Sequence, residues 1–224
     1  MESIAKNLQK IQQSIPENVT LVAVSKTKPI SDLQEGYNAG QRIFGENKIQ
    51  EMVSKHDALP KDIQWHMIGH LQRNKVKYMA HFVDLIHGVD TLKTLKEINK
   101  QAKNNNRTIK CLLQVKIAKE ETKFGFNFNE IEGLLSTVEF AELKNILIVG
   151  FMGMASFTDD QNQLKDEFSS LNTFFQNQKE KILSENCQLE TLSMGMSGDY
   201  SLAISNGSTM IRVGSAIFGN RNYN

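Results

Sequence analysis

The sequence of 224 residues predicts an α/β fold, a (β/α)8 TIM barrel in a single domain spanning residues 1–224, with an extra N-terminal helix. Three observations favour this class. Eight short apolar runs recur along the chain, the stretches between them have helical patterning, and no linker or low-complexity segment interrupts the order. Apolar strands that alternate with helices are typical of a parallel sheet covered by helices. A doubly wound open sheet remains the alternative, because closure of a sheet cannot be read from a pattern.

The predicted strands are nearly continuous apolar runs, each followed by a polar or helical stretch. In chain order they are LVAVSK (21–26), RIFGEN (42–47), WHMIG (65–69), FVDLIHGVD (82–90), IKCLLQVKI (109–117), ILIVGFMGM (146–154), ETLSMGM (190–196) and TMIRVGSAIF (209–218).

Helices are expected between these runs. Residues 30–40 open after Pro29 and close at a glycine, as helix starts and stops do. A further helix, over 158–183, has Thr158 as its candidate N-cap. The helix expected at residues 1–14 precedes the first strand, and we expect it to close the bottom of the barrel. Apolar positions at helical spacing predict two more helices, over 47–59 and 91–106.

Composition excludes several classes of partner. The formal net charge is +1, so no strong field attracts nucleic acid or an anionic membrane. No apolar run is long enough to span a bilayer, and the polar N-terminus is unlike a signal peptide. Cys111 and Cys187 are too few and too far apart for a disulfide framework, which favours reduced thiols. We therefore expect a cytoplasmic protein with no nucleic-acid or membrane partner.

The chemistry of such a barrel lies at the C-terminal ends of its strands. Polar and small residues occupy those ends in the first, second, seventh and eighth runs. They are expected to face one rim, and they are Lys26, Asn47, Ser197, Arg212, Gly214 and Ser215.

The last two turns have the composition of an anion site. Ser197 lies between glycines before a helix that begins near Asp199, and Gly214 and Ser215 follow the last strand. A small-residue turn before a helix presents free backbone N–H groups to an anion, and barrels commonly bind phosphate after strands 7 and 8. Ordinary βα turns have the same composition, so the turns alone support both interpretations equally.

Arg212 and Lys26 add the remaining groups of a ligand. Strand alternation places Arg212 on the same side as Gly214, where it either reaches water or donates to a ring heteroatom. An amine near an arginine and partly removed from water is held more easily in its neutral form, which forms Schiff bases with carbonyl compounds. A phosphate, a ring nitrogen and an aldehyde together indicate pyridoxal 5′-phosphate (PLP) as the cofactor.

Other candidates are weaker. Lys116, Lys119 and Lys123 are rival Schiff-base lysines, and Lys116 is the best of them because aldolases also combine a barrel lysine with a phosphate site. His66 and His70 are four residues apart, but they flank a strand end and a turn, so no metal site is expected.

Eight blocks of the sequence resemble the pyridoxal phosphate homeostasis protein family, whose members are related to the N-terminal barrel of alanine racemase. Gly88, where that family often has serine, and Ser215, where threonine is common, are small departures that remove no group the cofactor needs. The blocks are AVSKTKP, FGENKIQE, WHMIGHLQRNK, VDTLK, VKIAKEETKFGF, GFMGM, LSMGMSGDY and MIRVGSAIFG, in this order.

The resemblance implies a role for each rim residue. Lys26 would carry PLP as a Schiff base. Arg212 would face the pyridine nitrogen, and Asn47 would lie near the ring hydroxyl. The phosphate would be held by Ser197, Gly214 and Ser215.

An arginine at the ring nitrogen predicts binding without turnover. PLP is a strong electron sink only when this nitrogen is protonated, and a permanent cation cannot accept that proton. Racemisation also needs a second base, which alanine-racemase-like enzymes take from a C-terminal domain, and we expect no such domain in this chain. We therefore expect a monomeric, non-enzymatic PLP carrier in vitamin B6 homeostasis that releases PLP to apo-enzymes. A weak PLP-dependent enzyme such as an amino-acid racemase is the alternative, followed by a cofactor-free, aldolase-like use of the lysine.

Overall fold

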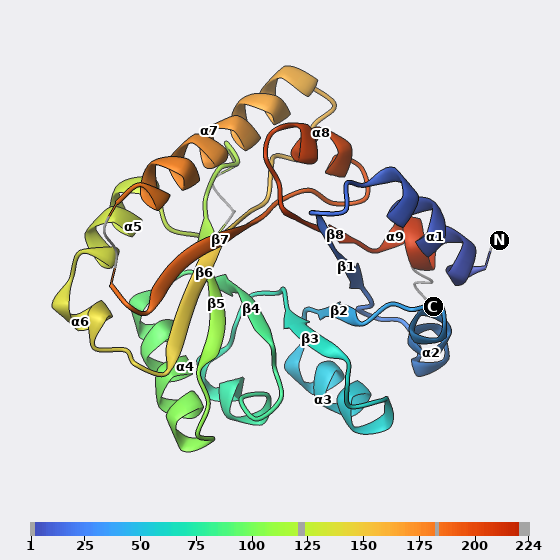
Figure 1. The fold of residues 1–224 in the computed structure, drawn as a ribbon, viewed down its shortest axis with the longest axis horizontal. Coiled ribbons are helices and arrows are strands. Elements are labelled where there is room, and N and C mark those ends of the chain that lie inside the picture. The colour runs from blue at the N-terminus through green and yellow to red at the C-terminus, as the bar shows by residue number, and fades with distance from the viewer. Residues whose placement is uncertain (1–2, 121–123, 182–183, 220–224) are drawn as a thin grey trace.

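The eight predicted strands are all present, and a computed structural model shows them as a closed parallel barrel (Figure 1). Each strand pairs with the next in the sequence, and β1 pairs with β8, so the open-sheet alternative is wrong. The structure describes residues 3–120, 124–181 and 184–219. The strands are β1 (Thr20–Val24), β2 (Ile43–Glu46), β3 (Gln64–Met67), β4 (Leu85–Val89), β5 (Ile109–Val115), β6 (Ile146–Gly153), β7 (Cys187–Ser193) and β8 (Met210–Val213).

Helices surround the barrel and cover the outer faces of the strands (Figure 1). The segment between β3 and β4 forms a 3-10 helix, η1 (Arg73–Tyr78), in place of an α-helix. The α-helices are α1 (Ile4–Ser14), α2 (Ile30–Asn38), α3 (Ile49–Ala58), α4 (Leu92–Asn104), α5 (Phe128–Leu135), α6 (Val138–Ala141), α7 (Gln161–Lys179), α8 (Tyr200–Ser205) and α9 (Ser215–Phe218).

Side-chain caps set where several helices begin. The carboxylate of Asp160 accepts hydrogen bonds from the N–H groups of Asn162 (2.9 Å) and Gln163 (3.2 Å), so α7 starts after it. The predicted cap at Thr158 is therefore wrong by two residues. The Thr158 hydroxyl accepts instead from the N–H of Asp160, and it closes the turn before the helix.

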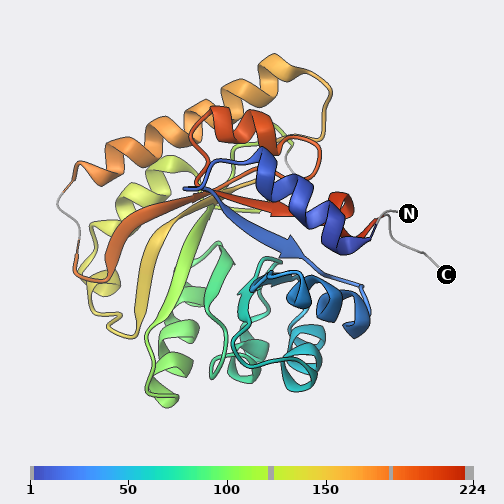
Figure 2. The ribbon, with the colours of Figure 1, turned by 45° about the vertical axis from the view of Figure 1, so that its right-hand side comes forward.

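The N-terminal helix α1 does not close the bottom of the barrel, contrary to expectation. It lies on the outside against α2 and α9, and both ribbon views show it beside the last helix (Figures 1 and 2). Leu8 and Ile11 bury its apolar face, and the Asn7 amide donates to the Ile217 carbonyl oxygen (2.9 Å). Helix α9 has only four residues, so it leaves room for α1 in the ring of helices outside the barrel.

The core has two layers because successive strand residues point to opposite sides of the sheet. The larger layer fills the space between strands and helices. In it, Phe151 of β6 packs against Phe174 and Phe175 of α7, with ring centroids 5.3 and 6.0 Å apart. A smaller apolar cluster fills the barrel interior and consists of Val22, Leu85, Leu112, Val149, Met152 and Met210.

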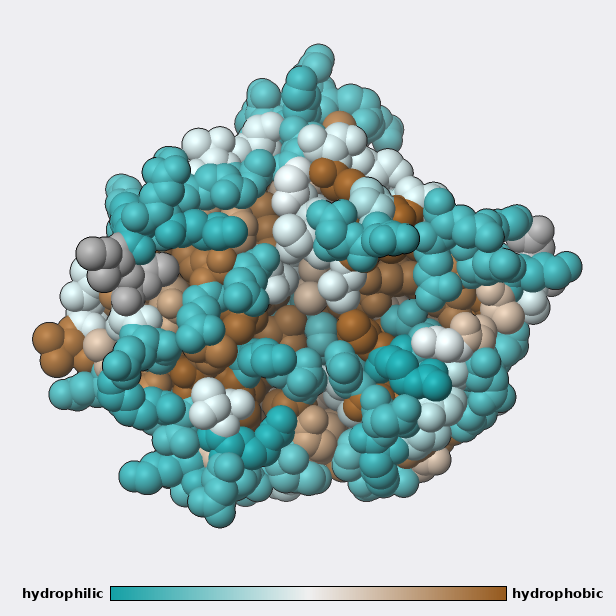
Figure 3. All heavy atoms as spheres, in the orientation of Figure 1, coloured by the Kyte–Doolittle hydropathy of each residue, from teal (hydrophilic) through white to brown (hydrophobic). Residues whose placement is uncertain are grey.

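Hydrophilic residues make up most of the visible outline of the molecule, whereas hydrophobic residues show mainly toward its middle (Figure 3). Cys111 and Cys187 are free thiols, both buried. Burial raises the pKa of both, that of Cys187 to about 12, so these thiols stay protonated and unreactive. None of the helices in the described ranges has the length and apolar character that a membrane span needs.

Candidate cofactor-binding site

A cavity of about 570 Å³ opens where the strands end. The six predicted rim residues all line it, and they come from the ends of β7, β8, β1 and β2. These four strands are neighbours only because the barrel closes between β8 and β1. The predicted residues that share the cavity are Lys26, Asn47, Ser197, Arg212, Gly214 and Ser215.

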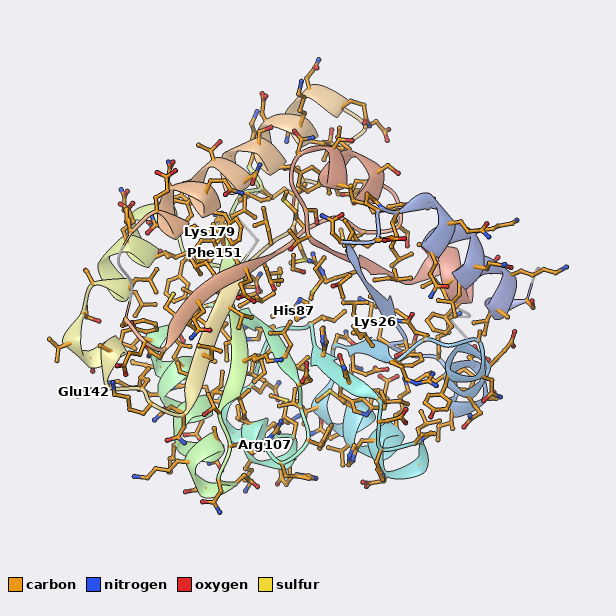
Figure 4. All side chains as sticks on the ribbon, viewed as in Figure 1. Lys26, His87, Arg107, Glu142, Phe151 and Lys179 are labelled. Carbon is orange, nitrogen blue, oxygen red and sulfur yellow. The ribbon has the colours of Figure 1, made fainter. Side chains whose placement is uncertain are left out.

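Lys26 lies two residues beyond the last residue of β1 and is half-buried at the edge of the cavity (Figure 4). The next residue, Thr27, has φ 64°, which is an outlier for a β-branched side chain and costs free energy. Its N–H donates to the Oε1 atom of Glu51 at 2.6 Å. The hydrogen bond from α3 therefore holds a strained turn directly beside the lysine.

A buried charge network supports the same turn from below. Lys55 Nζ donates to Glu46 Oε1 (2.7 Å), Glu51 Oε1 (2.7 Å) and the Ser25 carbonyl oxygen (2.8 Å). The Ser25 hydroxyl donates to the same Glu46 oxygen at 2.6 Å. Burial raises the pKa of Glu46, and the nearby Lys55 ammonium opposes this shift. The network thus joins the end of β1, the end of β2 and helix α3 under Lys26.

We expect Glu51→Ala to reduce the free energy of unfolding by about 1–3 kcal/mol, since the Thr27 N–H loses its acceptor and Lys55 loses one of its partners. It should also make the Lys26 turn easier to cleave by proteases. Chemical denaturation and limited proteolysis measure both effects. The matched control is Gln50→Ala, on the exposed side of the same helix. Equal stability of the two variants would contradict this role of Glu51.

The turns after β7 and β8 are joined to each other. The Gly214 N–H donates to the Ser197 hydroxyl oxygen at 3.2 Å. A Cβ atom at Gly214 would lie 3.1 Å from the Val24 carbonyl oxygen, so the turn approaches the end of β1 closely. Gly195 has φ 95°, which favours glycine. Small residues here let two strand ends and a hydroxyl group converge on one side of the cavity.

Arg212 forms a fixed cation at the cavity floor and does not reach out to water. Its side chain is buried, with 4% of the residue exposed. Nη1 donates to the carbonyl oxygen (2.9 Å) and hydroxyl oxygen (2.7 Å) of Ser193, and Nη2 donates to the Gly153 carbonyl oxygen (3.0 Å). Burial lowers the pKa of Arg212 to about 10, so the guanidinium stays protonated at neutral pH.

Asn47 lines the cavity and has an unpaired polar atom beneath its surface. Its Oδ1 atom is buried and has no hydrogen-bond partner among the described residues. A buried acceptor without a partner costs free energy, and native proteins usually satisfy such atoms. A bound polar ligand at this position would supply the missing partner.

The cavity residues that were not predicted include Lys28, His70, Gln114 and Phe124. Gln114 lies two positions after the inward-facing Leu112, so strand alternation could have found it. His70 stacks on Phe124 (ring centroids 4.9 Å apart), and its Nδ1 atom lies 3.3 Å from Asp90 Oδ2. Loop conformation brings His70 and Phe124 to the mouth of the cavity, and no sequence pattern predicts that position.

Two of the rival Schiff-base lysines, Lys116 and Lys119, do not line the cavity. Lys116 and Lys119 are exposed, and Lys123 lies outside the described residues. His66 is buried in the barrel interior whereas His70 lies at the mouth, so they share no site. Within the described ranges, no three metal-ligating side chains cluster.

These groups fit PLP. An amine at the rim suits an aldehyde, and the hydroxyl groups and backbone of the β7 and β8 turns suit a phosphate. A fixed guanidinium on the floor suits a ring nitrogen that accepts a hydrogen bond. Ile68 and Met154 supply an apolar wall that suits the face of the pyridine ring.

The fold and this cavity define a TIM-barrel protein of the alanine racemase N-terminal class. The family model described as "Alanine racemase, N-terminal domain" matches residues 1–222. The alanine racemase of Clostridium difficile has a TM-score of 0.76 at 13% sequence identity, and the match covers 99% of this chain and 57% of the racemase. That likeness concerns the fold alone.

Relatives with higher sequence identity identify the family within this class. The chain is 37% identical over 234 residues to the pyridoxal phosphate homeostasis protein of Pasteurella multocida, with 99% of each chain covered. PipY of Synechococcus elongatus, solved without and with PLP bound, has TM-scores of 0.90 and 0.87 at 34% identity, covering 96% of this chain and 100% of PipY. The chain belongs to the pyridoxal phosphate homeostasis protein family.

Proposed function

We propose that this protein binds PLP and acts in PLP homeostasis as a carrier that holds the cofactor without catalysing a reaction on it. Two kinds of observation support this. Relatives 35–37% identical over their whole length are pyridoxal phosphate homeostasis proteins, and PipY has been solved with PLP bound. In this chain, the rim lysine, the serine–glycine turns and the buried arginine line one cavity of suitable chemistry.

Each predicted rim residue has a place in this proposal. The Lys26 amine holds the aldehyde carbon as a Schiff base, and the Asn47 amide faces the ring hydroxyl. Arg212 donates to the pyridine nitrogen. The phosphate is held by Ser197, Gly214 and Ser215.

The main support for binding without catalysis is the buried guanidinium of Arg212. Bound PLP supplies a reversible carbonyl for amines and an electron sink whose strength depends on a protonated ring nitrogen. A buried guanidinium can only donate hydrogen bonds, so it keeps that nitrogen unprotonated and the sink weak. The site therefore favours storage of the aldehyde over chemistry on an amino acid.

We further infer that the protein works as a monomer in the cytoplasm and that apo-enzymes receive its PLP. All six residues that would hold PLP line one cavity of a single barrel, so the proposed site needs no residue from a second copy. Phe124, Phe157 and Met196 line the mouth with 60%, 97% and 39% of their surface exposed. Apolar surface exposed around a site is typical of contact with another protein.

A weak PLP-dependent enzyme, such as an amino-acid racemase, is the second candidate. His70 favours it, because it lines the same cavity as Lys26 and its ring lies 3.3 Å from the Asp90 carboxylate. A histidine paired with a carboxylate is a competent proton-transfer group.

The first test loads the purified protein with PLP. We expect one PLP per chain with a visible Schiff-base band, transfer of that PLP to an apo-aminotransferase, and no racemisation of L-alanine above background. Absorbance titration, recovery of aminotransferase activity and chiral chromatography measure the three. Failure to bind PLP would overturn the proposal. Robust racemisation that is lost in His70→Gln would establish the second candidate in its place.

A further inference from the structure

A row of polar side chains crosses the barrel interior below the cavity. It begins at Asp84, whose Oδ2 atom lies 3.7 Å from Nε2 of His66. His66 Nδ1 is 3.0 Å from His87 Nε2, and His87 Nδ1 is 3.2 Å from the Ser193 hydroxyl oxygen. Arg212 Nη1 completes the row at 2.7 Å from that same oxygen. The row joins β3, β4, β7 and β8, and His87 lies near the middle of the ring of strands (Figure 4).

The two ends of the row determine the direction of every hydrogen bond in it. A guanidinium only donates, so Arg212 donates to the Ser193 oxygen. The Asp84 carboxylate is too far from His66 for a direct hydrogen bond, but its negative charge attracts the N–H side of the ring, so the His66 nitrogen that faces Asp84 carries the proton. His66 Nδ1 is then an acceptor and receives the N–H of His87 Nε2. His87 Nδ1 therefore has a lone pair, which accepts the hydroxyl proton of Ser193.

The burial of the two histidine rings agrees with one proton on each ring. His87 and Ser193 have no exposed surface, and His66 is 2% exposed. Desolvation lowers the pKa of His66 and lowers that of His87 further below its usual range, and the Arg212 charge adds to the shift of His87. Both rings are thus neutral at physiological pH, with one proton each, as the row requires.

We propose that His87 is a positioning residue for the cofactor site, which acts through Ser193 on Arg212. By accepting the Ser193 proton, His87 turns the lone pairs of that oxygen toward Nη1 and fixes the plane of the guanidinium at the cavity floor. Arginine does not release a proton in proteins, so the row orients the cation and does not conduct protons. The inference rests on the proposed PLP binding, because Arg212 would face the ring nitrogen.

Two variants separate positioning from a general structural role. The Asn side chain places its amide near the position of Nδ1 of histidine, whereas that of Gln reaches the position of Nε2. His87→Asn can therefore still accept from Ser193, and His87→Gln can still contact His66 but leaves the Ser193 proton without its acceptor. We expect PLP affinity within about twofold of the unaltered protein for His87→Asn, and roughly five- to tenfold weaker binding for His87→Gln.

The absorbance maximum of the PLP-loaded protein provides a second readout, because it depends on the hydrogen bond at the ring nitrogen. It should shift in His87→Gln and stay in place in His87→Asn. Calorimetry and absorbance measure the two effects, with His81→Gln at an exposed position as the control. If both His87 variants weaken binding equally, or neither does, the inference fails. Failure of the unaltered protein to bind PLP would instead reject the proposed function.

Nitrogen-15 NMR of the unaltered, PLP-free protein tests the same assignment should a variant not fold. The expected result is a neutral His87 protonated on Nε2 and a neutral His66 also protonated on Nε2. A His87 that is charged, or protonated on Nδ1, would overturn the inference whatever the variants do.

Discussion

Lys26→Ala is expected to abolish the visible Schiff-base absorbance of the PLP-loaded protein while leaving the barrel folded. Lys26 is half-buried in a turn outside the barrel core, so its truncation should change the free energy of unfolding by less than about 1 kcal/mol. PLP should still bind weakly through the phosphate turns and Arg212. Absorbance titration gives the loss of the band, and thermal unfolding gives the stability.

Borohydride reduction followed by peptide mass spectrometry locates the attachment in the unaltered protein. We expect the reduced label on the peptide that contains Lys26. Lys116→Ala is the matched control, because Lys116 is exposed and does not line the cavity. Label on Lys28, which lines the same cavity, or on Lys116 would contradict the assignment to Lys26.

Lys55→Met is expected to cause the largest loss of stability, about 3–5 kcal/mol at neutral pH, because it leaves the buried Glu46 carboxylate without its cation. For a chain of this size, that corresponds to a fall in Tm of roughly 10 °C or more. The matched control is Lys103→Met, an exposed lysine on α4. The double variant Lys55→Met/Glu46→Gln should recover part of the loss, since it removes the unpaired charge.

The pH dependence of this variant has a definite sign. Burial already raises the pKa of Glu46, and removal of Lys55 raises it further. The folded state then keeps a proton on Glu46 at pH values where the unfolded chain has lost it, so stability falls as pH rises above the ordinary value of 4.5. The deficit relative to the unaltered protein should be smallest at about pH 4.5 and largest near pH 8. Denaturation curves across this range measure it, and a deficit independent of pH would show that charge burial is not its cause.

The sequence determined the alternation of strands and helices and the parallel sheet, because every unit repeats the same local signal. Each strand is an apolar run that ends in a turn, and such runs separated by helices can bury both faces only in a parallel sheet. It also predicted that six residues of the candidate site share one rim, and all six line one cavity. Parallel strands present their C-terminal ends to one rim, so Lys26, Arg212 and the small-residue turns could be assigned together without coordinates.

Tertiary structure alone decided which rim residues are neighbours and what supports them. Closure of the sheet places β8 beside β1. Nothing in the sequence of either strand indicates that the two strands pair. Lys55 and Glu46 look like solvated charges, because nothing in the sequence around them shows that α3 and the end of β2 bury both. His66, His87 and Ser193 meet only through the register of strands far apart in the chain. Local patterns record the periodicity of each element, whereas contacts between distant residues depend on how the closed barrel aligns all of its strands.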